Sequence, residues 1–234
     1  VWPAVRTMMH GDWTLRMAHG YSARANSLFA LAPGSVLTPG LLAEMEALFT
    51  AEGIVPTVRI SPLAAAGAME LLRRAGYGVD SVAQTMVLAD MPGASSVSPS
   101  TVQIADSLSG AWLAGVSARQ QQGKRNPDHL RDILSRLAVP ARFATAMRQG
   151  EAVGFGLAVV DNDWAELASI IVDEGWRGRG LGRAVVAQLL AAAQGAGARQ
   201  AFLQVEQSNA PALALYEAFG FRRAYDYVTL KKAV

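Results

Sequence analysis

The sequence of 234 residues contains no cysteine. Disulfide bridges, thiolate metal sites and cysteine nucleophiles are therefore excluded. Charged residues are also sparse, at 17% against 51% hydrophobic residues. Disordered chains show the opposite balance, so we expect a folded protein with a substantial buried core.

The chain also lacks an apolar run of the ~18 residues that a membrane-spanning helix needs. Its start, Val1-Trp2-Pro3, does not have the basic-then-apolar layout of a signal peptide. The formal net charge is only +2, and the basic residues form no run that would indicate a nucleic-acid partner. The three histidines have no metal-ligand spacing. We expect a cytoplasmic protein without a membrane partner, a nucleic-acid partner or a bound metal.

One segment, residues 91–100, is rich in Pro, Gly and Ser and is typical of a linker. It divides the chain into a first domain at residues 1–90 and a second at residues 101–234. Apolar spacing in the first domain predicts helices at Pro39–Thr50 and Leu63–Ala75 and strands at Thr57–Ile60 and Val82–Leu88.

The second domain shows a clearer alternation of strands and helices. The dipeptide Gln149-Gly150 predicts a tight hairpin turn between its first two strands. The expected helices are Ser107–Gln121, Asp128–Leu137, Leu181–Gln194 and Pro211–Phe219, and the expected strands are Phe143–Arg148, Val153–Val160, Trp164–Val172, Ala201–Glu206 and Tyr225–Leu230. The fold class is therefore mixed, with α-helices and β-strands in one domain.

A glycine-rich loop joins the strand Trp164–Val172 to the helix that begins at Leu181. Its glycines let the backbone approach a ligand closely, and the free N–H groups and dipole of the helix start attract an anion. Arg177 and Arg179 add positive charge. The loop matches neither the Gly-Lys-Ser/Thr nor the Gly-x-Gly-x-x-Gly nucleotide motif. It predicts a pyrophosphate site, and a turn that only tightens the connection is the alternative.

The segment Arg177-Gly178-Arg179-Gly180-Leu181-Gly182 resembles motif A of the Gcn5-related N-acetyltransferase (GNAT) superfamily. Leu203–Phe221, with Asn209, Leu215-Tyr216 and Gly220-Phe221, resembles motif B at the usual separation. The resemblance covers residues 141–230. It implies a mixed, mostly antiparallel central sheet flanked by helices, and an enzyme that uses acetyl-CoA.

The first half resembles the added N-terminal domain of some bacterial acetyltransferases over the segment Trp13–Ser27. That resemblance implies two tandem GNAT-like domains, the first a degenerate copy without a coenzyme loop. We expect the first half to wall the amine side of the cleft, with His10, His19, Tyr21 and Arg24 as candidates to face it.

The resemblance further implies a coenzyme site. The pantetheine arm would add to the end of the strand before the loop, where that strand splays from its neighbour, and the pyrophosphate would lie on the loop. Asn209 would contact the coenzyme, cap the helix that Pro211 opens, or do both. The implied residues are Ile170, Ile171, Val172, Arg177, Gly178, Arg179, Gly180, Leu181, Gly182, Arg183 and Asn209.

Two catalytic roles are also implied by the resemblance. Tyr216 matches the tyrosine that protonates the departing thiolate, against the alternative of a core tyrosine. Glu166 matches the general base of the histone-acetylating branch, against a solvated strand carboxylate. The branch that acetylates protein N-termini uses a glutamate where this chain has Gln204, which cannot accept the proton. The N–H of Val172 would polarise the thioester carbonyl.

Three functions remain open from the sequence. The first is an N-acetyltransferase that acts on a primary amine of a small metabolite by direct attack in a ternary complex. The second is a protein lysine or N-terminal acetyltransferase. The third is a non-catalytic module that senses acyl-CoA. The sequence names neither the acceptor nor the oligomeric state.

Overall fold

The computed structural model describes residues 2–91, 101–119 and 126–233, which form two compact units interleaved along the chain. The N-terminal unit comprises residues 2–85, 206–208 and 224–233. The C-terminal unit comprises residues 86–91, 101–119, 126–205 and 209–223. Strands β5 (Tyr77–Leu88) and β11 (Arg222–Lys232) each contribute residues to both units.

The predicted linker lies outside the described residues except for Met91. Met91 is buried in the core of the C-terminal unit, and its N–H donates to the carbonyl of Arg199 at 3.0 Å. Met91 is therefore part of the core of the C-terminal unit and does not behave as a linker residue. Residues 224–233, which the predicted division assigns to the second domain, belong to the N-terminal unit.

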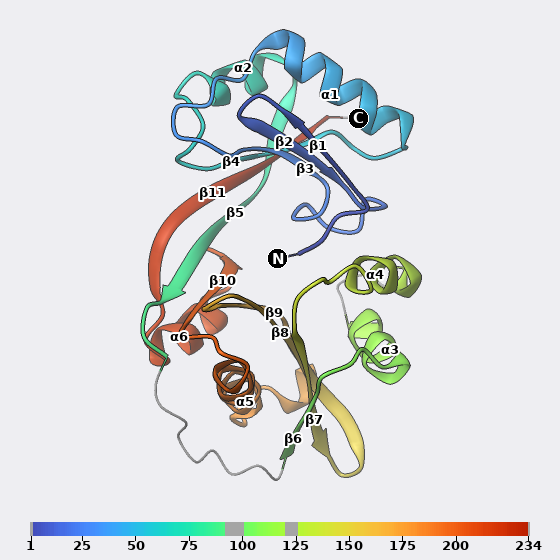
Figure 1. Cartoon of the computed structure of the whole chain (residues 1–234), viewed down its shortest axis with the longest axis vertical. Coiled ribbons are helices and arrows are strands. Elements are labelled where there is room, and N and C mark those ends of the chain that lie inside the picture. The colour runs from blue at the N-terminus through green and yellow to red at the C-terminus, as the bar shows by residue number, and fades with distance from the viewer. Residues whose placement is uncertain (1, 92–100, 120–125, 234) are drawn as a thin grey trace. The chain divides into compact units, whose positions relative to one another are not determined.

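The C-terminal unit contains five successive strands in the order β10-β9-β8-β7-β6. Neighbouring strands are antiparallel except for β9 and β10, which are parallel. Helix α5 lies on one side of these strands, and α3 and α4 lie on the other (Figure 1). The strands are β6 (Val102–Ala105), β7 (Ala141–Arg148), β8 (Glu151–Asp161), β9 (Trp164–Val172) and β10 (Gln200–Glu206). The helices are α3 (Gly110–Arg119), α4 (Pro127–Leu134), the 3-10 turn η2 (Glu174–Trp176), α5 (Leu181–Gly195) and α6 (Ala210–Ala218).

Local sequence explains most of these elements. Gln149 and Gly150 have φ of 52° and 83°, which matches the tight hairpin expected between β7 and β8. Helix α4 begins after Asn126, whose side chain accepts from the Asp128 N–H. Helix α4 ends earlier than predicted, at Leu134, and α3 begins later than predicted, at Gly110. Ser109 caps α3 by accepting from the Trp112 N–H at 3.1 Å, so α3 does not begin at Ser107.

The face of the sheet below α5 is closely packed around Gly156 of β8. A Cβ atom at Gly156 would lie 2.7 Å from side-chain carbons of both Leu189 and Val185, and 2.9 Å from one of Ile170. Helix α5 therefore approaches β8 closely because this position has no side chain.

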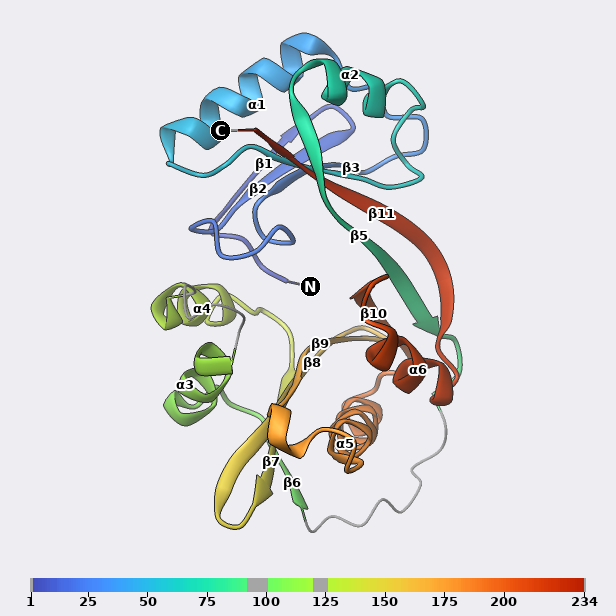
Figure 2. The ribbon, with the colours of Figure 1, turned by 180° about the vertical axis from the view of Figure 1, so that it is seen from behind.

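The N-terminal unit has the strand order β1-β2-β3-β4-β11, antiparallel except for the parallel pair β3 and β4. Figure 2 shows α1 and α2 above its strands. Its elements are β1 (Arg6–His10), β2 (Trp13–Met17), β3 (Ser27–Ala30), α1 (Pro39–Ala51), β4 (Thr57–Ile60) and α2 (Ala68–Arg74), followed by β5. The same order occurs in β7-β8-β9-α5-β10-α6-β11. A mixed and mostly antiparallel fold is confirmed, and a tandem origin of the two halves stays a prediction.

Sequence patterns missed β1, β2 and β3. Strand β2 is buried at four of its five positions, so it does not show the alternation of a half-exposed strand. The predicted helix Leu63–Ala75 is wrong over its first turn. Residues 63–67 form a turn instead, in which Ala64 bridges to Ser35, and α2 begins at Ala68. Strand β5 begins earlier than predicted, at Tyr77.

Among the described residues, no helix is long and apolar enough to cross a membrane.

We predict that Gly156→Ala destabilises the C-terminal unit by about 1–3 kcal/mol, because the new Cβ overlaps side chains of α5. Gly195→Ala is the matched control, since nothing lies within 4 Å of its added Cβ and alanine stabilises a helix. Urea unfolding followed by circular dichroism measures both. An unchanged midpoint for Gly156→Ala would contradict the packing described here.

Candidate functional site

The parallel pair β9 and β10 separates before either strand ends. Pairing runs from Trp164↔Gln200 to Leu167↔Leu203 and stops there, although β9 continues to Val172. On its other edge, β9 remains paired with β8 as far as Val172. The edge of β9 that faces β10 therefore presents backbone groups after Leu167 to a gap in the sheet. Such groups must find a partner in water or in a ligand.

A β-bulge lies in β9 at the start of this gap. Ser169 has a φ of 52°, a value that non-glycine residues rarely adopt, and the register with β8 shifts between Phe155 and Leu157. A bulge bends its strand and increases the local twist. The end of β9, residues Ile170–Val172, follows this bulge and has no register pair with β10 among the described residues. All three residues are partly buried.

The glycine-rich loop follows directly and opens α5. Gly178 and Gly180 have φ of 71° and 78°, and Gly180 is the N-cap without a capping side chain. The first N–H groups of α5 therefore have no acceptor within the helix and carry its positive dipole end. The Leu181 side chain is buried in the core, so only its backbone can serve a ligand. Gly182 lies against Leu215, 3.4 Å from where a Cβ would stand.

Three arginines surround the loop, and all three are exposed. Arg177 donates from Nε to the carbonyl of Val172 at 3.3 Å, which ties the loop to the end of β9. Arg179 lies over the ring of Trp176 at 4.9 Å, and Arg183 lies over the ring of Phe219 at 5.0 Å. These contacts hold the cationic side chains beside the helix start, where an anion would bind.

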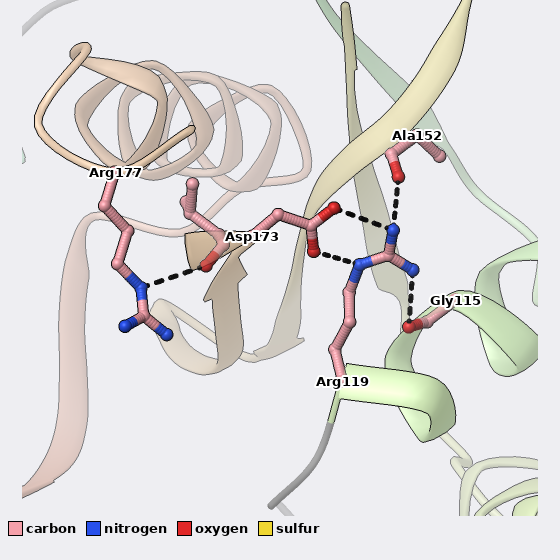
Figure 3. A network of polar contacts seen from close by, with 6 residues as sticks. Gly115, Arg119, Ala152, Asp173 and Arg177 are labelled. Carbon is pink, nitrogen blue, oxygen red and sulfur yellow. Dashed lines mark hydrogen bonds and ion pairs between the residues drawn. The ribbon is translucent and has the colours of Figure 1, made fainter. Parts of the chain in front are cut away.

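An ion pair anchors the beginning of the loop to α3 (Figure 3). The Nε and Nη2 atoms of Arg119 both bond the carboxylate of Asp173, the latter at 2.8 Å. Arg119 also donates to the carbonyls of Gly115 at 3.1 Å and Ala152 at 2.8 Å, and it lies over the ring of Phe155. Hydrogen bonding by Asp173 raises the pKa of the Arg119 guanidinium. The loop thus starts from a fixed point that bridges α3, β8 and β9.

Sequence analysis did not find this ion pair. Arg119 and Asp173 are 54 residues apart, and neither belongs to a motif. The positive φ of Ser169 was also not predictable, because no turn residue marks it.

Glu166 is buried, with 4% of its surface exposed. Its neighbours Ala165 and Leu167 belong to the core cluster below α5, so the Glu166 side chain points to the opposite face of β9. It lies opposite Val159 of β8 and Phe202 of β10, one residue before pairing between β9 and β10 stops. The alternative of a solvated strand carboxylate is therefore wrong.

Tyr216 lies in α6, and Asn209 is the N-cap residue directly before this helix. Tyr216 is 7% exposed and belongs to the core cluster below α5, where its ring meets Phe221 edge-on at 5.9 Å. Asn209 caps α6 by accepting from the Ala212 N–H at 3.2 Å. The capping role expected for Asn209 is thus present, and a coenzyme contact stays a prediction.

The site residues occupy both faces of the sheet. Glu166 lies on the side opposite α5, whereas Tyr216 and the loop lie on the α5 side. The gap between β9 and β10 is where the two sides meet. Among the described residues, no group of three His, Asp or Glu side chains could hold a metal ion. The loop suits a pyrophosphate and the strand edge suits an amide-bearing chain, so these residues fit acetyl-CoA.

We predict that Asp173→Asn destabilises the C-terminal unit by about 1–2 kcal/mol, because it removes the charge that balances the half-buried Arg119. Asp128→Asn is the control, since its ion pair with Arg131 is exposed and should contribute nothing measurable. Thermal unfolding measures both variants. Equal midpoints for the two variants would show that the Arg119 anchor does not stabilise the loop.

The model of the acetyltransferase (GNAT) family matches residues 108–221. The uncharacterized N-acetyltransferase YobR of Bacillus subtilis is 27% identical over 94% of this chain and 90% of its own length. A ribosomal-protein alanine N-acetyltransferase of Escherichia coli is 38% identical over 33% of this chain and 52% of its own length. A mycothiol acetyltransferase of Thermobispora bispora is 38% identical over 36% of this chain and 31% of its own length.

Solved structures agree on the fold. A GCN5-related N-acetyltransferase from Kribbella flavida has a TM-score of 0.72 at 17% identity, covering 99% of this chain and 90% of that chain. A tandem GNAT protein from the clavulanic acid biosynthesis pathway has a TM-score of 0.64 at 16% identity, covering 86% and 75%. The family predicted from the two motifs is confirmed: the chain carries a GNAT acetyltransferase domain at residues 108–221, whose general reaction is acyl transfer from acetyl-CoA.

Proposed function

We propose that this protein transfers the acetyl group of acetyl-CoA to a primary amine of a small metabolite. The observation that carries this proposal is the parting of β9 and β10 after Leu167 and Leu203, directly beside an exposed glycine and arginine loop. The open strand edge suits the amide-bearing arm of coenzyme A. The loop, which follows directly along the chain, suits its pyrophosphate.

The coenzyme contacts follow from this geometry. The backbone of Ile170, Ile171 and Val172 receives the pantetheine amides. The N–H groups that begin α5, from Leu181 to Arg183, receive the pyrophosphate, with Arg177 and Arg179 as counter-charges. Asn209 adds a contact from the start of α6. In the described part of the first half, the start of α1 offers no equivalent site, because Thr38 caps α1 and residues 31–40 contain no basic side chain.

Catalysis uses the two faces of the sheet. The amine nitrogen attacks the thioester carbon, and its proton passes to Glu166, directly or through a water molecule. The C–S bond then breaks, and the thiolate takes a proton from the Tyr216 hydroxyl. The chain has no cysteine that could carry an acyl intermediate, so the transfer is direct and requires both substrates to be bound together.

Two relatives suggest different acceptors. The mycothiol acetyltransferase is named for a small molecule and the E. coli enzyme for a protein alanine. A small-molecule acceptor is favoured here, because Gln204 stands where the resemblance to protein N-terminal acetyltransferases requires a glutamate. A protein acceptor and a non-catalytic acyl-CoA sensor are the alternatives that the experiments below distinguish.

The coenzyme site is tested by calorimetric titration of the full chain with acetyl-CoA. We expect one molecule per chain, and an affinity about tenfold or more lower for Arg179→Glu, because a cation beside the pyrophosphate becomes an anion. Arg136→Glu, which alters a surface ion pair with Asp132, is the control and should bind normally. Two molecules per chain, or no effect of Arg179→Glu, would overturn the assignment of the loop.

The catalytic roles are tested by release of free CoA with a broad panel of primary amines. We expect Glu166→Gln to lower kcat by about 10²–10⁴-fold while acetyl-CoA affinity is retained, because the amine loses its proton acceptor. Tyr216→Phe should lower kcat by removing the proton donor. Wild-type turnover by both variants would contradict both roles. Tight binding of acetyl-CoA without CoA release for any amine or peptide would favour the sensor.

A further inference from the structure

Two aromatic side chains lie on the same face of the sheet as Glu166. The rings of Trp164 in β9 and Phe202 in β10 meet edge-on, with centroids 6.1 Å apart. Their neighbours in sequence, Ala165 and Ala201, belong to the core cluster below α5. Side chains alternate along a strand, so both rings point to the face opposite α5, as Glu166 does. Trp164 and Phe202 are called the aromatic pair below.

The aromatic pair flanks the proposed base. Phe202 is the register partner of Glu166, and neighbouring strands lie roughly 4.8 Å apart. Trp164 precedes Glu166 by two residues, which is roughly 6.6 Å along β9. Pairing between β9 and β10 stops one residue after Glu166, at Leu167. A ligand whose reacting atom lies beside Glu166 therefore has both rings within reach.

Both rings are partly exposed, although the side chains near them on this face are buried. Leu157, Val159 and Ala168 are 0%, 2% and 5% exposed, whereas Trp164 and Phe202 are only partly buried. Exposed aromatic surface is unfavourable in water. A ligand ring that packs edge-on against the aromatic pair removes this surface from water and adds a favourable ring contact.

The strands around Glu166 offer no partner for an anion. Residues 155–161, 164–168 and 200–204 contain no Lys, Arg or His. A carboxylate on the acceptor would lie near Glu166 without a cation from these strands, which is unfavourable. Apolar surroundings have a useful effect on an amine, because they favour its neutral form, and only the neutral form attacks the thioester.

We propose that the aromatic pair recognises the acceptor, and that the acceptor is a primary amine with an apolar or aromatic group and no carboxylate. The amine nitrogen lies beside Glu166, and the apolar group packs against Phe202 and Trp164. This assignment rests on the proposed function, since it names the acceptor of the same site. The aromatic pair determines specificity and takes no part in making or breaking bonds.

The test compares acetyl transfer by the full chain to 2-phenylethylamine, ethylamine and L-phenylalanine. The first amine carries a ring, the second lacks it, and the third adds a carboxylate. We expect kcat/KM for 2-phenylethylamine to exceed each of the other two values about tenfold or more, because its ring is buried in the transition state.

Two variants test the aromatic pair itself. Phe202→Ala and Trp164→Ala should each lower the preference for 2-phenylethylamine over ethylamine about threefold or more. Ethylamine is the internal control, because it is too short to reach the rings and its kcat/KM should stay unchanged. A merely structural role of the rings would lower kcat/KM for both amines equally. Phe202→Tyr and Trp164→Phe keep a ring and should retain most of the preference.

Binding is measured without turnover, by calorimetric titration of the CoA-loaded full chain with 2-phenylethylamine. We expect the wild type to bind this amine and Phe202→Ala to bind it about tenfold more weakly. If the wild type binds the amine but transfers no acetyl group, the proposed function fails and the assignment of the aromatic pair stands. The assignment is overturned if 2-phenylethylamine does not bind, if both alanine variants keep the wild-type preference, or if L-phenylalanine or ethylamine is the better acceptor.

Discussion

The C-terminal unit depends on where backbone pairing between β9 and β10 stops. Up to Leu167 and Leu203 the two strands satisfy one another, and beyond that point β9 bends at the Ser169 bulge. The cost is a strand edge without a protein partner inside a sheet. In the proposed function, this opening is where groups on the two faces of the sheet act on one ligand. Gly156 of β8 leaves room for the side chains of Val185 and Leu189 of α5 and for that of Ile170 after the bulge.

The loop after β9 contains conformationally free glycines, and it is also held in place by hydrogen bonds and an ion pair. Gly178 and Gly180 adopt positive φ, which exposes the first N–H groups of α5, and three arginines supply charge. A loop of this kind would be mobile on its own. Arg119 prevents this at its start by bridging Asp173, Ala152 and Gly115, and Arg177 ties its middle to Val172. An anion site that is already formed loses less entropy when its ligand binds.

The N-terminal unit repeats the order of strands and helices but not the chemistry. Helix α5 begins at a glycine without a side-chain cap, whereas α1 begins at Thr38, whose hydroxyl accepts from the Leu41 N–H. In α1, a side chain of the protein thus occupies the place that corresponds to the proposed anion site. Arg59 lies on the face of the sheet opposite α1 and α2, where its Nε donates to the hydroxyl of Ser27 at 3.1 Å.

Local sequence determined the hairpin at Gln149-Gly150, the limits of β9, the helix after the loop and the cap at Asn209, because each depends on residues close together in the chain. The motifs at Arg177–Gly182 and Leu203–Phe221 together likewise indicated the family. Only the tertiary structure decided the burial of Glu166 and its face, the bulge at Ser169, the Arg119–Asp173 pair and the contacts of Arg59 with Phe29 and Ser27. These depend on contacts between residues far apart in sequence, as do the missed strands β1 to β3, and periodicity reports only on neighbours along one element.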